Sequence, residues 1–232
     1  LNEDGTLNQA NASSFVQWEP IGDVTRTENP SAEPNHAGVI VDDQTEIEHR
    51  KFKGIFNGQE YAIKGMYINK GIEFDQALFS NNYGTVKNIQ INDSYVHAEG
   101  QYIASVAGSN WGNIEDCINE GTVIGGNYYA WIGGIVGVSR SGNIQNCING
   151  GNIVGPSVGG IVAYCRDSYI SNCNNMGFIL SPSDAGGLVC SLIESMLYAC
   201  LNSGAVGSST TGDLSAGVAL EIQDSILHSS AN

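Results

Sequence analysis

The chain has 232 residues and a formal net charge of −15, because 24 aspartates and glutamates outnumber nine lysines and arginines. Binding to phosphate needs clustered cations, so nucleic acid is not expected as a partner. No run of 18 apolar residues occurs, so no transmembrane segment is expected either. The 30 glycines exceed the usual share of about 7% and favour a chain with many tight turns.

Residues 1–51 have little internal pattern. They contain "FVQWEPIG" at 15–22, followed by a polar and acidic stretch at 23–50. One apolar run in that stretch, "AGVIV" at 37–41, fits a strand. From residue 52 onward, short apolar segments alternate with Gly, Asn and Ser, which is typical of strands of about five residues or fewer and leaves no room for helices.

Two sequence blocks recur through the rest of the chain. The first is Gly-Gly-aliphatic-aliphatic, as in "GGIVG" at 133–137, and related blocks begin at residues 76, 104, 159, 186 and 216. The second is Cys-x-Asn-x-Gly, which begins at Cys117, Cys147, Cys173 and Cys200. The start of each first block lies 13 or 14 residues before the cysteine position of the same coil. The distance from that cysteine position to the next first block varies from 12 to 16 residues. One fixed arm and one variable arm indicate a solenoid in which one loop of each coil accepts insertions.

These repeats predict an all-β fold, a parallel β-helix (β-solenoid) with coils of 26–30 residues and about three short strands per coil. The Gly-Gly-Ile-Val block itself is predicted to be the first strand. Right-handed winding is expected, as in most parallel crossovers. The chain then forms one domain over 1–232, with 1–51 as an N-terminal cap carrying the acidic excursion and 52–232 as stacked coils. The last coil, ending "HSSAN", stops before its glycine, so we expect further coils or domains of the same protein.

Stacking in register brings equivalent residues together in columns. The four cysteines form an inward column, and a ladder of amides along the axis is expected from Asn119, Asn149, Asn175 and Asn202. Positive φ at a turn is expected from the glycines that follow, Gly121, Gly151, Gly177 and Gly204. The cysteines fit buried free thiols, with one disulfide or a metal site as alternatives. If a disulfide exists, the expected pair is Cys165 and Cys190.

Three segments resemble bacterial GLUG-motif proteins: "WEPIG" at 18–22, "FKGIFNGQEYAIKGMYI" at 52–68 and the repeated "GGIVG". The family pattern is Trp-x-Pro-Ile-Gly, then Phe-x-Gly-x-Phe-Asp-Gly-Asn-Gly-x-x-Ile, then repeats of Gly-aliphatic-aliphatic-Gly. Asn57, Gln59 and Glu60 depart from Asp-Gly-Asn-Gly. The resemblance covers most of residues 15–220 and implies a secreted or surface-anchored protein, often adhesin-like. Such repeats also precede some immunoglobulin A-cleaving metallopeptidases, but no His-Glu-x-x-His occurs here, so no peptidase activity is carried over.

A column of acids is the first candidate for chemistry. The eighth residue after the start of each Gly-Gly block is Ser141, Asp167, Glu194 or Asp224. Stacking would space three carboxylates about 4.8 Å apart along the axis, and a retaining glycosidase needs two carboxyl groups about 5–5.5 Å apart. The other interpretations are solvated turn residues and a Ca²⁺ site, and the ordinary turn chemistry of Asp beside Ser favours the first of these.

Aromatic residues in a variable loop are the second candidate. "GGNYYAWIG" carries Tyr128, Tyr129 and Trp131, and "HAEGQYI" carries Tyr102. Exposed rings stack on sugars or anchor protein interfaces, so a glycan or a host protein is the expected ligand; inward packing is the alternative. Arg140 and Arg166 share a column, but they are the only Lys or Arg residues after Lys87, so no cationic cleft for acidic polysaccharide is expected.

The sequence therefore favours a non-catalytic repeat module of a bacterial cell-surface or secreted protein, serving adhesion or ligand binding or acting as a rigid spacer. The alternative is a carbohydrate-active β-helix enzyme, a glycosidase or polysaccharide lyase, that uses Asp167, Glu194 or Asp224. No Ser-His-Asp triad signature, phosphate-binding loop or zinc-ligand spacing occurs, so no cofactor or resident metal is expected.

Overall fold

A computed structural model describes residues 2, 6–8, 16–22, 51–208 and 214–232 of the chain. Every regular element in these residues is a strand, and the strand pairs are parallel. Equivalent residues of neighbouring coils pair directly: Val136 pairs with Val162, which pairs with Val189. About six turns stack in this way, so the predicted all-β parallel β-helix is confirmed. Within the described residues, no helix has the length and hydrophobicity that a membrane crossing requires.

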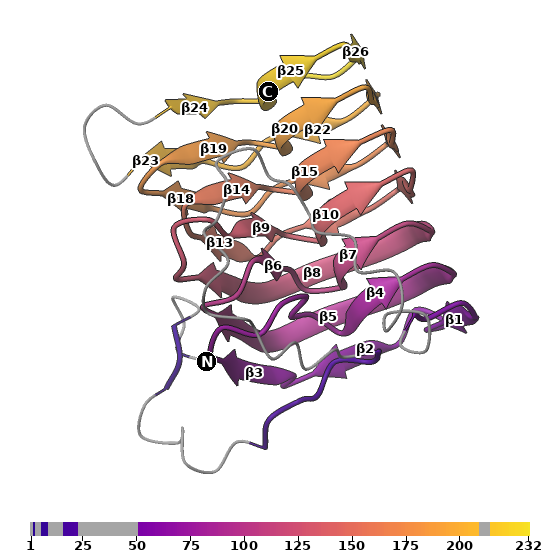
Figure 1. Ribbon diagram of the computed structural model, residues 1–232, viewed down its shortest axis with the longest axis vertical. Helices are drawn as coiled ribbons and strands as arrows, with labels where there is room; N and C mark the ends of the chain where they lie inside the picture. The colour runs from indigo at the N-terminus through magenta and orange to yellow at the C-terminus, as the bar shows by residue number, and fades with distance from the viewer. Residues whose placement is uncertain (1, 3–5, 9–15, 23–50, 209–213) are drawn as a thin grey trace, which may run out of the picture.

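Two of the three sheets lie on the side of the molecule seen in Figure 1. The six-stranded sheet contains β4 (Phe79–Asn82), β7 (Ala107–Asn110), β10 (Val136–Arg140), β15 (Val162–Arg166), β20 (Val189–Ile193) and β25 (Ala219–Gln223). The five-stranded sheet contains β6 (Tyr102–Ile103), β9 (Trp131–Gly133), β14 (Ser157–Gly159), β19 (Asp184–Gly186) and β24 (Leu214–Ala216).

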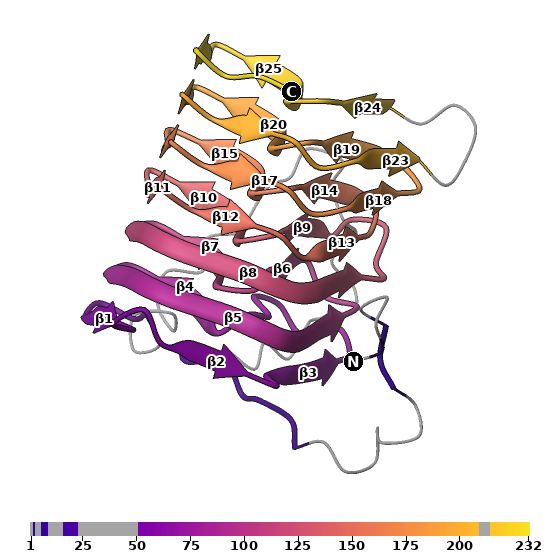
Figure 2. The ribbon, with the colours of Figure 1, turned by 180° about the vertical axis from the view of Figure 1, so that it is seen from behind.

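The fifteen-stranded sheet closes the tube on the opposite side (Figure 2). The first coil contributes β1 (Ile55–Asn57), β2 (Ala62–Lys64) and β3 (Tyr67–Lys70), and the next two contribute the long strands β5 (Thr85–Ala98) and β8 (Asn113–Gly125). Later coils contribute β11 (Asn143–Gln145), β12 (Ile148–Asn149), β13 (Asn152–Val154), β16 (Tyr169–Ser171), β17 (Asn174–Asn175), β18 (Ile179–Ser181), β21 (Met196–Tyr198), β22 (Leu201–Asn202), β23 (Val206–Ser208) and β26 (Ile226–His228).

The strands divide more finely than the sequence predicts. A complete later coil has five short segments, such as β9 to β13, distributed over the three sheets. The prediction that the Gly-Gly-Ile-Val block is itself a strand is wrong: Gly133 ends β9, Val136 begins β10, and the two residues between them form a bend. The bend explains its glycines, because a Cβ on Gly133 would overlap the carbonyl oxygen of Val136. Strands β5 and β8, with 14 and 13 residues, exceed the expected length because their pairing continues through the corner at Ile89 and Cys117.

Columns of aliphatic side chains fill the tube. Ile114, Ile144 and Ile170 follow one another in register and are fully buried. Each such side chain contributes roughly 1.5–3 kcal/mol when it leaves water. Ordering a backbone residue costs about 1–2 kcal/mol, so a single coil of some 26 residues could not hold itself together and the coils must stack.

Aromatic side chains cover the core at the first coil. The rings of Phe52 and Phe79 lie 4.8 Å apart, and Trp18 packs against the same cluster. Residue Ile21 forms a parallel bridge with Phe79, so the described segment 16–22 runs over this end of the core. The excursion expected at 23–50, with its strand at 37–41, lies outside the described residues.

Each coil turns at a cysteine corner, defined as the residue pairs 116–117, 146–147, 172–173, 199–200 and 229–230. The first residue of each pair is left-handed, with φ of 51–55°. The thiol of Cys147 donates to the carbonyl of Gln145 two residues earlier, and the sulfur of Cys173 accepts the N–H of Cys147 at 3.4 Å. All six cysteines are buried and free. The sulfurs of the corner cysteines, Cys117, Cys147, Cys173 and Cys200, therefore act as hydrogen-bonding groups between coils.

An asparagine ladder runs beside the cysteine corner. Asn149 accepts a hydrogen bond from the side chain of Asn119 at 2.8 Å and donates one to Asn175 at 2.7 Å. Its oxygen also accepts the N–H of Gly151, two residues on, at 3.3 Å. The ladder continues from Asn175 to Asn202 at 2.7 Å. Buried amides that donate and accept between coils fix the stacking register, because a slip would orphan both groups.

The prediction of positive φ at Gly121, Gly151, Gly177 and Gly204 is wrong, since the described glycines with positive φ are Gly22, Gly65 and Gly155. The glycines of this column are required by close approach instead. A Cβ on Gly151 would overlap the carbonyl oxygen of Gly121 in the preceding coil, and the same holds for Gly177 against Gly151.

Candidate functional site

The acids expected to carry chemistry lie at a second corner, the acid corner, defined as residue pairs 141–142, 167–168, 194–195 and 224–225. Asp167, Glu194 and Asp224 occupy equivalent positions on successive coils, directly after residues that pair in register. All three are exposed and left-handed, with φ between 47° and 49°. Asp is among the residues that tolerate this conformation best.

Serine follows the acid at the acid corner, as Ser168, Ser195 and Ser225, in the way that cysteine follows the left-handed residue at the cysteine corner. The hydroxyl of Ser168 donates to the carbonyl of Arg166 at 2.8 Å, and the N–H of Ser168 donates to the hydroxyl of Ser195 at 3.0 Å. In lower coils the turn is one residue shorter, and the side chain of Asn110 accepts the N–H of Gly112 at 3.2 Å instead. In the later coils, a turn with one more residue replaces the turn closed by the asparagine side chain. The extra residue is left-handed, and in three coils it is an acid.

Charge at the acid corner is paired across coils. The guanidinium of Arg166 lies 3.1 Å from a carboxylate oxygen of Glu194 and 3.8 Å from one of Asp167. The hydrogen bond to Glu194 raises the pKa of Arg166. These side chains are 44–58% exposed, so water screens the interaction. Within the described residues, no group of three or more His, Cys, Asp and Glu side chains is placed to hold a metal ion.

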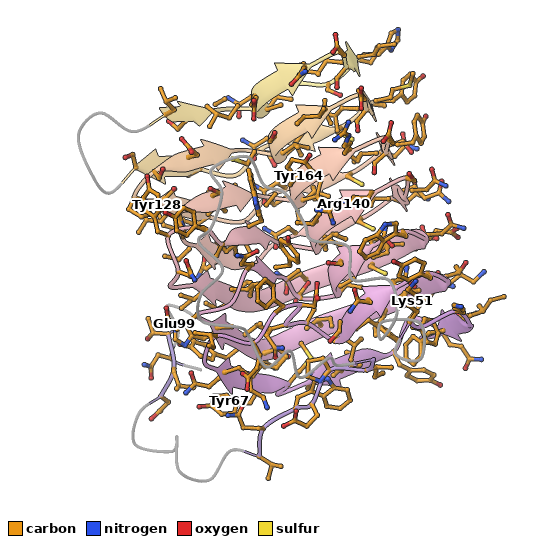
Figure 3. The ribbon with its side chains drawn as sticks, viewed as in Figure 1. Lys51, Tyr67, Glu99, Tyr128, Arg140 and Tyr164 are labelled. Carbon is orange, nitrogen blue, oxygen red and sulfur yellow. The ribbon has the colours of Figure 1, made fainter. Side chains whose placement is uncertain are left out.

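The predicted aromatic residues separate into two groups. Tyr128 is 71% exposed and Tyr129 is 41% exposed, with their rings edge-to-face at 5.3 Å. Both belong to the loop between β8 and β9. Tyr128 lies at the side of the molecule (Figure 3). Trp131 and Tyr102 pair with each other as neighbours in β9 and β6 of the five-stranded sheet.

A shallow depression of about 320 Å³ lies beside Tyr128. We call it the tyrosine notch; its other lining residues are Gly125, Gly126, Val154, Gly155, Pro156, Leu180 and Pro182. The notch arises because loop lengths differ: five residues connect β8 to β9, but only two connect β13 to β14. Two prolines and an exposed ring give it a rigid, largely apolar wall.

Trp131 and Tyr102 belong to a second hydrophobic cluster, outside the tube. Tyr102 packs with Phe74 and Val138, and the ring of Trp131 lies edge-on to Tyr164 at 5.3 Å. Tyr102 is only 8% exposed. Tyr102 is therefore neither exposed nor part of the core inside the tube, because it is buried in this outer cluster.

A row of stacked aromatic and cationic side chains adjoins this cluster, and we name it the aromatic–arginine row: Tyr83, Trp111 and Arg140. These residues follow Asn82, Asn110 and Ser139, which pair in register on successive coils. The rings of Tyr83 and Trp111 stack at 4.7 Å. The guanidinium carbon of Arg140 lies 5.7 Å from the ring centroids of Trp111 and Tyr164 and 5.9 Å from that of Tyr102.

Sequence reasoning identified Arg140 as a column member but missed its aromatic surroundings. The available signal was "NNYG" at 81–84 and "SNWG" at 109–112, which place an aromatic residue between Asn and Gly in successive coils. That repeat is less conspicuous than the glycine and cysteine blocks because Arg140 breaks it in the third coil.

Comparisons with known proteins give no match: no family model fits the chain, and neither the curated proteins nor the solved structures include a significant relative. The resemblance to GLUG-motif proteins therefore depends on the sequence motifs alone.

Proposed function

We propose that this chain is a non-catalytic repeat module of a bacterial cell-surface or secreted protein, and that it binds a glycan. The observation that carries the proposal is the tyrosine notch, where Tyr128 and Tyr129 project from a rigid coil. Exposed aromatic rings bury apolar surface against the C–H face of a sugar, while their hydroxyls bond its hydroxyl groups. The surface location is supported by the resemblance of "WEPIG" and "GGIVG" to GLUG-motif proteins.

The polar groups inside the solenoid support a scaffolding role for the coils rather than a catalytic one. The buried asparagines and the corner serines and cysteines already bond to neighbouring coils, so they are committed to structure. Binding is then left to side chains in loops and on outer faces, which is the usual division of labour on rigid scaffolds.

A glycan array tests the proposal. Wild-type protein should bind a subset of glycans, and Tyr128→Ala should weaken that binding at least tenfold. Tyr61→Ala is the matched control, since Tyr61 is 74% exposed but lies beside β2, far along the chain from the notch. A wild-type protein that binds no glycan, or a Tyr128→Ala variant that binds as wild type does, would overturn the proposal and leave a rigid spacer.

The second candidate is a carbohydrate-active enzyme. The observation that favours it is the placement of Asp167 and Glu194 on adjacent coils, with Asp224 on the next. A panel of polysaccharides incubated with wild-type protein and with Glu194→Gln decides between the candidates. Turnover that disappears in the variant supports the enzyme, whereas glycan binding without turnover supports the binding module.

A further inference from the structure

Arg140 differs from its column neighbour in the partners that it has. Arg166 is paired with Glu194 and Asp167. Within the described part of the chain, the guanidinium of Arg140 has no hydrogen bond and no ion pair, and three aromatic rings lie within 5.9 Å of it. The chain has 24 carboxylate side chains, so a lack of anions does not explain this.

The aromatic rings hold Arg140 without using its hydrogen-bond donors. A cation near a ring is attracted by the π-electrons, whereas the five N–H groups of a guanidinium point outward in its plane and need acceptors. The side chain is partly buried, which limits the conformations that it samples. A preorganised guanidinium with vacant donors is what binding of an oxyanion requires.

The surroundings of Arg140 determine the shape of the ligand. Tyr164 lies beside it on β15, and the two are neighbours on the face seen in Figure 3. Trp131 adds ring surface from the five-stranded sheet, and the buried side chains of Tyr102 and Val138 support these rings from within the cluster. Aromatic rings beside a single guanidinium group suit a ligand that has a ring and a carboxylate attached to it.

We propose that Arg140, with Tyr102, Trp111 and Tyr164, forms a subsite for a pyranose unit that carries a carboxylate. The two carboxylate oxygens would each accept an N–H of Arg140, and the C–H face of the sugar would lie against an aromatic ring. The site is distinct from the tyrosine notch and depends on the proposed function only in taking a saccharide as ligand.

The electrostatics of the chain limit the ligand to a sparsely charged glycan. Arg166, the next cation along the column, is already paired, and the net charge of −15 repels a polyanion. The absence of a cationic cleft, expected from the sequence, is compatible with one isolated anion subsite. The ligand class is therefore a mostly neutral saccharide with a single acidic unit at the site.

Tryptophan fluorescence provides the test, because Trp111 lies 5.7 Å from Arg140 and Trp131 belongs to the adjoining cluster. A neutral oligosaccharide and its counterpart with one glucuronate unit are titrated at about 0.15 M salt, where repulsion beyond about 8 Å is screened. The acidic oligosaccharide should change the fluorescence and bind wild type at least tenfold more tightly than the neutral one. Arg140→Gln should lose that preference, and the control Arg166→Gln should keep it.

Three outcomes would overturn the subsite. They are equal affinity of the two oligosaccharides for wild type, a preference retained in Arg140→Gln, and binding of an acidic peptide in place of the saccharide. Should Arg140→Gln fail to fold, the wild-type comparison and Arg140→Lys, which keeps the charge but loses the planar fork, decide the question. If wild type binds the acidic and the neutral oligosaccharide equally while array binding through Tyr128 is intact, the subsite is removed and the proposed function stands.

Discussion

The backbone N–H of Cys147 donates a hydrogen bond to the sulfur of Cys173 on the following coil, 3.4 Å away. The same bond joins Cys173 to Cys200 at 3.4 Å and Cys200 to the hydroxyl of Ser230 at 3.2 Å. Thiol and hydroxyl therefore have the same role at the corner. Each accepts an N–H from the preceding coil and donates to the backbone carbonyl two residues earlier in its own coil.

Replacement of Cys173 by serine should be tolerated because of this equivalence. Cys173→Ser keeps both hydrogen bonds and should stay within about 1 kcal/mol of wild type in free energy of unfolding. Cys173→Val, of similar size, leaves the N–H of Cys147 without an acceptor and should cost about 1–3 kcal/mol. Urea unfolding measures both, and equal losses in the two variants would refute the hydrogen-bonding role.

Truncation within the asparagine ladder should be costly. Asn149→Ala leaves the side-chain oxygen of Asn175 without its donor from Asn149 and removes the acceptor for Gly151, at about 1–3 kcal/mol for each group. The control is Asn143→Ala, which removes an exposed bond to Asn113 and should change the free energy of unfolding by less than about 0.5 kcal/mol. Similar losses from both substitutions would contradict the ladder's importance.

A methyl group on Gly160 should strain the solenoid. It would overlap the carbonyl oxygen of Gly187 and the side chain of Asn175, so Gly160→Ala should destabilise by about 1–3 kcal/mol or more. On Gly150, the nearest atoms would be 3.7 Å and 3.9 Å away. Gly150→Ala should therefore leave the melting temperature nearly unchanged, and calorimetry of the two variants checks the difference.

The cysteine corner at residues 199–200 has an unfavourable residue at its left-handed position, and a substitution can correct this. Ala199 is left-handed, with φ of 51°, where Asn146 and Asn172 stand in the preceding coils. Left-handed backbone costs an ordinary residue about 1–2 kcal/mol, and Asn bears it better. Ala199→Asn should raise the free energy of unfolding by about 0.5–1 kcal/mol. A drop in melting temperature for both Ala199→Asn and Ala199→Gly would show that φ is not the limiting factor.

The buried thiols should make the protein sensitive to alkali. Burial, with Asp184 and Glu221 nearby, raises the pKa of Cys190 from about 9 to about 12, and burial raises the pKa of Cys147, Cys165 and Cys173 too. Only the unfolded chain ionises these thiols between pH 9 and their folded pKa. Their contribution to stability is thus complete below pH 9 and is lost as pH rises through that window.

Each thiol should add about 1.4 kcal/mol per pH unit to the slope of this loss. Urea unfolding of wild type and Cys190→Ser at pH 8, 9, 10 and 11 isolates the contribution of one thiol from that of titrating Tyr and Lys. The variant should lose stability less steeply than wild type above pH 9. Parallel curves would contradict the raised pKa.

The fold was predictable because stacking forces like residues into columns. Residues Cys147 and Asn149 recur at a constant spacing, and a constant spacing is visible without coordinates. The backbone conformation within each coil was harder to predict from the sequence. In a sequence, a glycine that recurs at a constant spacing, such as Gly151, fits either a positive φ or a close approach of the neighbouring coil, and only the structure shows that it is the second. At the cysteine corner, the left-handed residue is instead the one before the corner cysteine, such as Asn146.

The candidate sites were only partly predictable, because they join residues that do not repeat. Tyr128 and Trp131 are three positions apart, yet one projects from a loop and the other packs in a strand. The cage around Arg140 takes Tyr102 from one coil and Tyr164 from another. Such contacts depend on which side of a bend each ring occupies, and periodicity carries no information on that.

The direction of the ladder bonds has a mechanical consequence. Bonds such as Asn149 to Asn175 join one coil to the next, so they run along the long axis and bear any tension applied between the two ends. Because the coil boundaries lie in series, each one carries the full force, and the weakest boundary should give way first, so we expect the coils to be released one at a time. Val162 lies 26 residues after Val136, and Ala219 lies 30 after Val189. At about 3.3–3.6 Å per extended residue, each released coil would yield roughly 85–110 Å of slack, so under tension the module would extend in steps.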